Sequence, residues 1–425
     1  MSDLNQTPTS ERVQIGIFGR VNAGKSSVLN VLTGQEMAVV SSQKGTTTDP
    51  VRKAMELLPI GPVMLYDTPG LGDDTDLGTR REQKTGEILR RIDMALLVVD
   101  ATEPHPMTSE KKLLAEFEKG SIPFVVIANK CEAMDEAARD ALVQDLAKEL
   151  DIDPKSVMPF SCRERTWGMR PEDLRERIAV LGREKKGSDK RLVADLLREG
   201  DVVVLVIPID ESAPKGRLIL PQQQVIRDAI EAGAVVMAVR PLELAAALER
   251  LKEPPRMVIT DSQAFGEVDR ILPREIPLTS FSILMARYKG DLPWQAKGAK
   301  AIDALEPGAR ILVAEGCTHH RQCGDIGTVK LPGWIEARRG GIFSYHFTSG
   351  GEFPQDVSEY DLIIHCGGCT LPPKEMQWRL ARARAAGVPI TNYGTMIAYL
   401  NGILDRATEV FAVDAEMWKF CRAWK

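Results

Sequence analysis

The sequence lacks any apolar run long enough to cross a membrane. Its longest apolar stretches, such as VVVLVIPI at residues 202–209, are much shorter than the roughly 20 residues that a membrane helix requires. The N-terminal segment MSDLNQTPTSER is polar and offers no apolar core for a secretory signal. We therefore expect a soluble, cytoplasmic protein that has no membrane partner.

The sequence also lacks a long basic run, and aromatic residues make up only 5% of the chain. The formal net charge is −5, whereas proteins that bind nucleic acid usually carry a basic patch or stacking aromatic residues. We therefore expect no nucleic-acid partner. No internal repeat is evident, and a chain of 425 residues is too long for one hydrophobic core, so two or three domains are expected.

Short apolar runs alternate with helical patterns along most of the chain, which predicts an α/β fold with parallel sheets. A charged segment at residues 183–191 interrupts this alternation. We predict three α/β domains, at residues 11–182, 193–270 and 271–425. The middle domain has too few residues to cover both faces of its sheet, and an unpaired sheet edge can pair with another chain. A homodimer or a higher oligomer is therefore expected.

Residues 19–26, GRVNAGKS, fit the phosphate-loop pattern G-x-x-x-x-G-K-S and lie between a predicted strand and a predicted helix. Backbone N–H groups of such a loop surround phosphate oxygens, while Lys25 reaches the β- and γ-phosphates and Ser26 binds Mg²⁺. The predicted nucleotide-binding residues of this loop are Gly19, Asn22, Ala23, Gly24, Lys25, Ser26 and Ser27.

Four further segments follow in the order that a GTPase requires. GTTTD at 45–49 offers a switch threonine, and DTPG at 67–70 offers a carboxylate for Mg²⁺ and an N–H for the γ-phosphate. NKCE at 129–132 and SC at 161–162 are placed to contact the guanine. The predicted base-contacting residues are Asn129, Lys130, Glu132, Ser161 and Cys162. The predicted magnesium ligands are Ser26, Thr47 and Asp67, and the predicted catalytic residues are Lys25, Asn22, Thr47, Asp67 and Gly70.

These five segments resemble those of the small GTPases of the translation-factor class, and most closely those of its tRNA-modification and ribosome-assembly branch. The resemblance implies that Asn22 binds K⁺ beside the phosphates. The chain departs from that class at Glu132, where an aspartate is usual, so the strictness of the guanine preference stays open. Leu71 stands where Ras-like proteins carry a water-positioning glutamine, so we expect slow intrinsic hydrolysis of GTP.

Cysteine and histidine are scarce, with seven and five residues, but they are concentrated in one region. The pattern reads Cys317-x-His319 and, after 45 residues, His365-Cys366-x-x-Cys369. Disulfides are rare in cytoplasmic proteins, so this clustering predicts a metal site. Predicted strands end at Cys317 and Cys366, and parallel strands would bring both ligand pairs to one sheet edge. Structural zinc and an iron–sulfur cluster both suit such a ligand set.

The domain order and the C-terminal C-x-H…H-C-x-x-C site resemble the HydF family, the maturation GTPases of [FeFe]-hydrogenase. The resemblance implies a [4Fe-4S] cluster bound by Cys317, Cys366 and Cys369, with His319 or His365 as the candidate fourth ligand. It also implies that the protein hydrolyses GTP, carries a diiron subcluster as cargo and delivers it to apo-[FeFe]-hydrogenase. The radical-SAM maturases that build the diiron unit are the further partners that it implies.

Two other functions are compatible with these motifs. One is a potassium-dependent GTPase of tRNA modification or ribosome assembly that carries a structural zinc module. The other is an iron–sulfur redox protein regulated by GTP. The metal content of the protein distinguishes the zinc-containing alternative from the other two.

Overall fold

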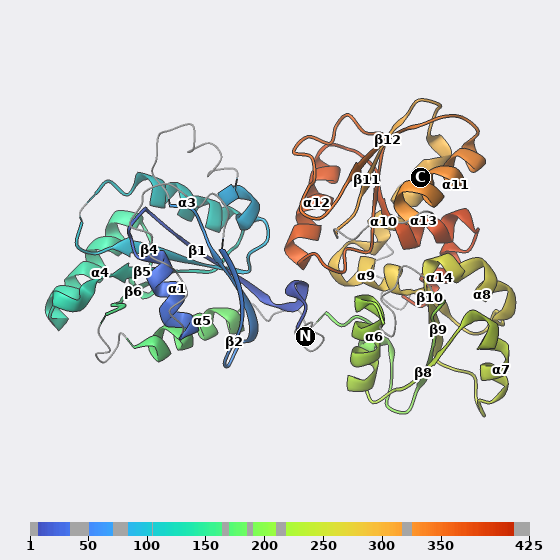
Figure 1. The fold of residues 1–425 in the computed structure, drawn as a ribbon, viewed down its shortest axis with the longest axis horizontal. Coiled ribbons are helices and arrows are strands. Elements are labelled where there is room, and N and C mark those ends of the chain that lie inside the picture. Colours follow the sequence, from blue (N-terminus) through green and yellow to red (C-terminus); the bar gives the residue numbers. More distant parts are fainter. Residues whose placement is uncertain are drawn as a thin grey trace. The chain divides into compact units, whose positions relative to one another are not determined.

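The computed structural model describes residues 7–34, 51–70, 84–103, 105–163, 170–184, 190–209, 218–316 and 325–411. The chain divides into two compact units, Met1–Asp189 and Lys190–Lys425, each with α/β architecture (Figure 1). In the described part of the chain, no helix combines the length and the apolar character that a membrane crossing needs.

The first unit is built on a six-stranded sheet with the order β2-β3-β1-β4-β5-β6. Its strands are β1 Val13–Gly19, β2 Val51–Leu57, β3 Gly61–Asp67, β4 Met94–Asp100, β5 Phe124–Asn129 and β6 Val157–Pro159. Only β2 pairs in the antiparallel sense, with β3. The central strands β1 and β4 are buried along almost their whole length, as expected for parallel strands that are covered on both faces.

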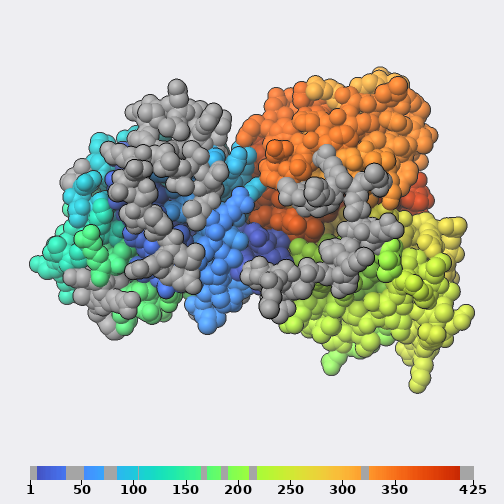
Figure 2. All heavy atoms as spheres, viewed as in Figure 1, coloured from blue at the N-terminus to red at the C-terminus, as the bar shows by residue number. Residues whose placement is uncertain are grey.

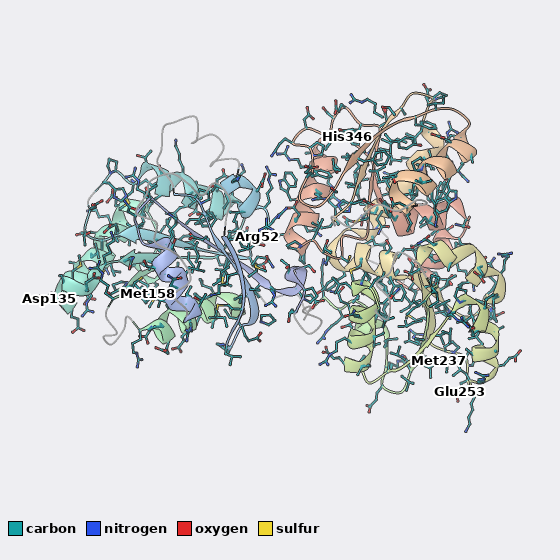
Figure 3. All side chains as sticks on the ribbon, in the orientation of Figure 1. Arg52, Asp135, Met158, Met237, Glu253 and His346 are labelled. Carbon is teal, nitrogen blue, oxygen red and sulfur yellow. The ribbon has the colours of Figure 1, made fainter. Side chains whose placement is uncertain are left out.

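The helices of the first unit connect the parallel strands. They include α1 Lys25–Thr33, α3 Thr108–Lys119, α4 Glu136–Leu150 and α5 Pro171–Glu184. Asp135, labelled in Figure 3, caps the start of helix α4, and its side chain accepts a hydrogen bond of 2.8 Å from Ala138 N. Such a cap satisfies a backbone donor that the first turn of a helix leaves unpaired.

The second unit contains two four-stranded parallel sheets. The first has the order β10-β9-β7-β8 and the second has the order β12-β11-β13-β14. Their strands are β7 Val202–Val206, β8 Val235–Val239, β9 Met257–Thr260, β10 Leu278–Ser280, β11 Arg310–Ala314, β12 Ser344–Thr348, β13 Leu362–His365 and β14 Ile390–Asn392. Because β10 pairs with β9, the first sheet extends past residue 270, where we placed a domain boundary.

Helices α9 and α10 lie between the two sheets of the second unit (Figure 1). The helices are α6 Leu220–Glu231, α7 Leu244–Glu249, α8 Phe265–Ile271, α9 Phe281–Lys289, α10 Leu292–Lys300, α11 Leu331–Arg339, α12 Pro373–Ala385, α13 Tyr393–Leu400 and α14 Leu404–Glu409. One continuous apolar core includes residues of both sheets and of α9, α10 and α13. In Figure 2 the half that contains the first sheet is coloured yellow-green, the half that contains the second sheet is coloured orange, and the two adjoin.

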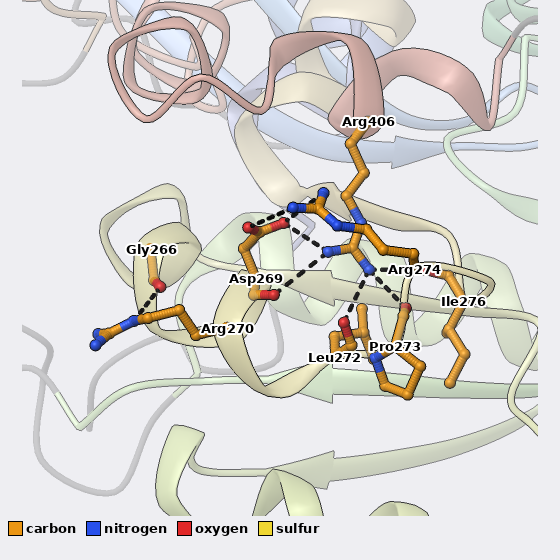
Figure 4. A network of polar contacts seen from close by, with 8 residues as sticks. All are labelled: Gly266, Asp269, Arg270, Leu272, Pro273, Arg274, Ile276 and Arg406. Carbon is orange, nitrogen blue, oxygen red and sulfur yellow. Dashed lines mark hydrogen bonds and ion pairs between the residues drawn. The ribbon is translucent and has the colours of Figure 1, made fainter.

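A buried arginine on the last helix reinforces this connection (Figure 4). Arg406 donates to Asp269 Oδ1 at 2.5 Å and to the carbonyl oxygens of Leu272 and Pro273 at 3.1 and 2.7 Å. Asp269 also accepts from Arg274 at 3.3 Å. The network binds α14 to the connection between α8 and β10, so the two halves of the unit are held together by polar contacts as well as by the core.

The two edge strands of the β10-β9-β7-β8 sheet differ in exposure. Strand β10 is buried, whereas β8 is partly exposed along its length, with Val235 57% exposed. Met237 in Figure 3 marks this strand. An exposed apolar edge strand presents unpaired backbone groups to a second strand.

Candidate functional site

The phosphate loop connects the end of β1 to the start of α1. Its last residue, Gly24, has a left-handed φ of 94°. A Cβ atom at Gly24 would lie 2.2 Å from Nδ2 of Asn129, which donates a 2.9 Å hydrogen bond to Ala23 O. Only glycine fits both the conformation and the space. The loop is thus joined to the end of β5, which carries the NKCE segment.

The ammonium group of Lys25 lies inside the loop. Lys25 is 8% exposed, and its Nζ donates to the carbonyl oxygens of Gly19 and Arg20 at 3.0 and 2.8 Å. The Arg20 side chain in turn lies 3.7 Å from Oε1 of Glu110 on α3, a carboxylate that is buried. The positive charge of Lys25 is therefore held at the centre of a backbone that can surround phosphate oxygens.

Two of the three residues expected to bind Mg²⁺, Ser26 and Asp67, meet at the start of α1 and the end of β3. Ser26 Oγ donates to Asp67 Oδ2 at 2.7 Å, and the other carboxylate oxygen, Asp67 Oδ1, is buried without a hydrogen-bond partner among the described residues. Burial raises the pKa of Asp67, while the Ser26 hydrogen bond and the Lys25 charge partly offset this effect. A divalent cation would satisfy the unpaired oxygen, so the donor set fits Mg²⁺.

The DTPG segment lies directly against the phosphate loop. A Cβ atom at Gly70 would lie 2.4 Å from Cγ2 and 2.9 Å from the backbone nitrogen of Val21. Residue 70 must therefore be small for the segment to approach the loop this closely. Asn22, the candidate K⁺ ligand, is exposed in the same loop with a left-handed φ of 67°. Thr47 and Leu71 lie outside the described residues.

The two segments that are predicted to contact the guanine also meet one another. Cys162 Sγ donates to Asn129 Oδ1 at 3.4 Å, and Ser161 Oγ donates to Glu132 Oε2 at 3.0 Å. Lys130, with a left-handed φ of 73°, pairs with Asp100 at the end of β4. The longer side chain of Glu132 is thus held by Ser161, whose neighbour Cys162 contacts Asn129, and its carboxylate is a group that can accept hydrogen bonds from the N–H groups of a base.

Burial keeps the neighbouring thiol protonated. Burial, together with the charge of Glu132, raises the pKa of Cys162 to about 12. Cys162 is therefore a neutral packing and hydrogen-bonding group at neutral pH. The raised pKa gives no support to thiolate chemistry at this position, and the contact of this segment with the guanine stays a prediction.

The cysteine region of the second unit lies at the carboxyl ends of β11 and β13, which are hydrogen-bonded parallel neighbours. Cys366 Sγ accepts hydrogen bonds from the backbone N–H groups of Gly316 at 3.0 Å and Gly368 at 3.3 Å. The hydroxyl of Thr370 donates to Gly316 O at 2.7 Å. The residue that precedes Cys317 in the chain is therefore tied to the loop that carries Cys366 and Cys369.

Hydrogen bonds of this kind stabilise a thiolate and suit a sulfur that ligates iron. Burial, and to a smaller extent the neighbouring Cys366, raises the pKa of Cys369 to about 11, although the charge of Lys289 acts in the opposite direction. A metal ion overrides such a shift because a coordinating thiol loses its proton. Cys366 and Cys369 thus fit an iron–sulfur cluster as two of its three predicted thiolates.

His365 is engaged through both ring nitrogens. Arg379 Nη1 lies 2.9 Å from His365 Nε2, and because a guanidinium can only donate, Nε2 accepts this bond. His365 Nδ1 then carries the proton and donates to Cys366 O at 2.8 Å. Arg379 is itself fixed by Glu375 at 3.2 Å. This arrangement leaves His365 no lone pair for iron, so it gives no support to His365 as the fourth ligand.

The other predicted ligands, Cys317 and His319, lie outside the described residues. Within the described ranges, no group of three or more His, Cys, Asp or Glu side chains is arranged to hold a metal ion. The complete ligand set therefore stays a prediction.

Several buried polar residues at these sites escaped the sequence analysis. Glu110 and Arg379 gave weak signals, since each charged residue belongs to an ordinary amphipathic helix. Lys289 ends the helix FSILMARYK, where a basic residue is common for reasons of helix polarity alone. Only the fold reveals that this side chain is buried.

Comparison with protein families assigns the second unit. Residues 192–290 match a domain described as the hydrogen maturase F dimerization domain, and residues 293–410 match the hydrogen maturase F tetramerization domain. Residues 14–130 match the domain described as 50S ribosome-binding GTPase. The chain belongs to the hydrogen maturase F family. The resemblance inferred from the C-terminal pattern is thereby confirmed.

Curated relatives match the GTPase part. GTPase Der from Sulfurimonas denitrificans is 33% identical over 140 residues, which are 32% of this chain and 28% of that protein. The tRNA modification GTPase MnmE from Coxiella burnetii is 35% identical over 136 residues, 30% of this chain and 29% of that protein. The chain thus spans less than a third of the length of these relatives.

Solved structures also match part of the chain at low similarity. A probable GTP-binding protein engB has 22% identity and a TM-score of 0.34, with 41% of this chain and 100% of that chain covered. A variant of Era from Aquifex aeolicus has 19% identity and a TM-score of 0.34, with 53% of this chain and 93% of that chain covered.

Replacing the buried carboxylate tests the magnesium assignment. Folding raises the pKa of Asp67. The protonated carboxyl therefore contributes to the free energy of unfolding below its unfolded pKa, and this contribution is lost as pH rises through the folded pKa. In protein freed of Mg²⁺ and nucleotide, Asp67→Asn should therefore raise the unfolding temperature of the first unit at pH 7 by a few degrees. The gain should shrink as pH falls, while Mg²⁺-dependent GTP binding is lost.

The exposed Asp140 on α4 provides the control, and Asp140→Asn should change neither property. Calorimetry and nucleotide titration with and without Mg²⁺ measure the two effects. Undiminished Mg²⁺-dependent binding in Asp67→Asn would contradict the assignment.

Proposed function

We propose that the chain is a GTP-hydrolysing scaffold that holds a [4Fe-4S] cluster and a diiron cargo and delivers the cargo to apo-[FeFe]-hydrogenase. The hydrogen maturase F domains of the second unit support this function. Within that unit, the observation that carries the proposal is the thiol of Cys366, which accepts two backbone N–H groups at the end of β13. The radical-SAM maturases are the proposed source of the cargo.

GTP hydrolysis is proposed for the first unit, which matches a GTPase domain. Lys25, Ser26 and Asp67 would bind the phosphates and Mg²⁺, and the Gly70 segment would approach the γ-phosphate. Thr47 would complete the magnesium site, Asn22 would hold K⁺, and turnover would be slow because Leu71 cannot orient water. The cation would add positive charge where the leaving phosphate develops negative charge.

Lys25→Ala tests this assignment. The variant loses the charge that stabilises the transferring phosphoryl group, so GTP turnover should fall by roughly 10²–10³-fold. Phosphate release is measured in potassium and in sodium salts, and the wild type should be slower in sodium. Lys111→Ala, on the exposed side of α3, is the control and should hydrolyse GTP at the wild-type rate. Wild-type turnover in Lys25→Ala would refute the proposed site.

Cluster binding and delivery are proposed for the second unit. Cys366→Ala removes a sulfur that the fold positions with two N–H donors, so the variant should lose the cluster. It should also fail to activate apo-hydrogenase while its GTP turnover is unchanged. His365→Asn keeps a donor for the Cys366 carbonyl and should retain iron with an unaltered spectrum, whereas His319→Ala should alter it.

Iron, zinc and acid-labile sulfide are measured in anaerobically purified protein, followed by hydrogen evolution after mixing with apo-hydrogenase. Stoichiometric zinc without iron in the wild type would favour the RNA-linked GTPase with a zinc module. Full activation by Cys366→Ala would exclude the scaffold function.

Self-association is proposed to use the exposed edge strand β8. The matched dimerization domain contains this strand, and pairing of two β8 edges about a two-fold axis would satisfy their unpaired backbone groups. Several exposed apolar side chains lie in the same domain, including Ile230, Val235 and Leu242.

Val235→Lys places a charge on this edge and should shift the protein toward smaller species. Sedimentation velocity over a range of protein concentrations measures the change. The control is Val329→Lys, an exposed position elsewhere in the second unit, which should leave the dimer intact. An unchanged association constant in Val235→Lys would exclude β8 as the contact.

A further inference from the structure

A lysine is buried beside the cysteine loop. Lys289 ends α9 and is 1% exposed. Its ammonium donates to three carbonyl oxygens, those of Gly368 at 3.1 Å, Cys369 at 2.8 Å and Leu371 at 2.8 Å. All three carbonyls belong to the loop between β13 and α12. The side chain thus places a positive charge at the base of this loop.

Helix capping does not explain this position. A basic residue in the last turn of a helix normally interacts with the carbonyls of its own helix and remains in water. The carbonyls bound by Lys289 are about 80 positions away in the chain. Removing an ammonium from water costs several kcal/mol, and the three carbonyl oxygens of the cysteine loop offset part of this cost.

The end of α9 is held in place independently of the ammonium. Gln377 Nε2 on α12 donates to the backbone oxygens of Lys289 at 2.6 Å and Gly290 at 3.1 Å. Helix α9 also starts directly from β10, the buried edge of the first sheet of this unit. The backbone of Lys289 is therefore fixed by the fold, and its charge is aimed at the loop.

The ammonium of Lys289 lies against the backbone of the cysteine pair. It donates to Cys369 O at 2.8 Å and to the oxygen of Gly368, which lies between Cys366 and Cys369 in the chain, at 3.1 Å. A fixed positive charge at this position favours any anionic group that the thiolates bind. A cluster held by thiolates carries net negative charge, and one-electron reduction increases it.

We infer that Lys289 is the fixed counter-charge of the iron–sulfur cluster, and that it makes the cluster easier to reduce than the thiolates alone would allow. The inference rests on the proposed binding of the cluster by Cys366 and Cys369. Net charge and hydrogen bonding around the sulfurs are established determinants of cluster potential. Lys289 acts through the loop and the field, so it is a positioning residue and not an iron ligand.

The test uses the full chain with three substitutions at one position. Lys289→Met and Lys289→Gln remove the charge, and Lys289→Arg keeps it. Lys300→Met, at an exposed position on α10, is the control. Each anaerobically purified protein is analysed for iron and sulfide, for thermal unfolding, and for midpoint potential by dithionite titration followed by electron paramagnetic resonance.

Both uncharged variants should show a more negative midpoint potential than the wild type. Lys289→Arg should recover most of the difference, and the control should match the wild type. If Lys289 were merely structural, the substitutions would change the unfolding temperature and the iron content, but the midpoint potential would not follow the charge at residue 289.

Equal potentials in the wild type, Lys289→Met and Lys289→Gln would overturn the inference while leaving the scaffold function intact. Loss of cooperative unfolding in all three variants would assign Lys289 a structural role only and would overturn it as well. A wild-type protein that binds no iron would contradict the proposed function itself, and the inference with it.

Discussion

The pairing of parallel strands that are distant in the sequence determines where the chemistry of this chain can occur. Strands β1 and β3 pair so that Ile17 lies opposite Asp67, and β11 and β13 pair so that Ala314 lies opposite His365. In each case the residues beyond the carboxyl ends meet at one edge of the sheet. Ser26 thereby reaches Asp67, and Gly316 reaches the thiol of Cys366.

The sequence was informative where chemistry requires a fixed spacing along the chain. The phosphate loop, the DTPG segment and the strands that precede the cysteines could be located because each combines a buried apolar run with a short polar motif. The α/β class and the family resemblance followed from the same signals. The alternation of strands and helices predicts that the strands pair in parallel, but it does not predict the order of the strands within each sheet.

The remaining features depend on contacts that local sequence does not encode. The three-residue strand β10 lies beyond residue 270 and is too short to have a recognisable apolar pattern, so the expected domain boundary divides its sheet. The engagement of both ring nitrogens of His365 depends on Arg379, which is 14 residues away on another element. From sequence, a histidine beside two cysteines is predicted to be a metal ligand. Only the structure shows that both ring nitrogens of His365 have other hydrogen-bond partners.

Two of the described lysines, Lys25 and Lys289, show one physical solution at two sites. Lys25 donates to carbonyls of the phosphate loop, and Lys289 donates to carbonyls of the cysteine loop. Carbonyl oxygens accept from an ammonium and fix its position. Each loop therefore positions a cation together with the groups that would bind an anion, which is phosphate at the first site and the proposed thiolate-bound cluster at the second.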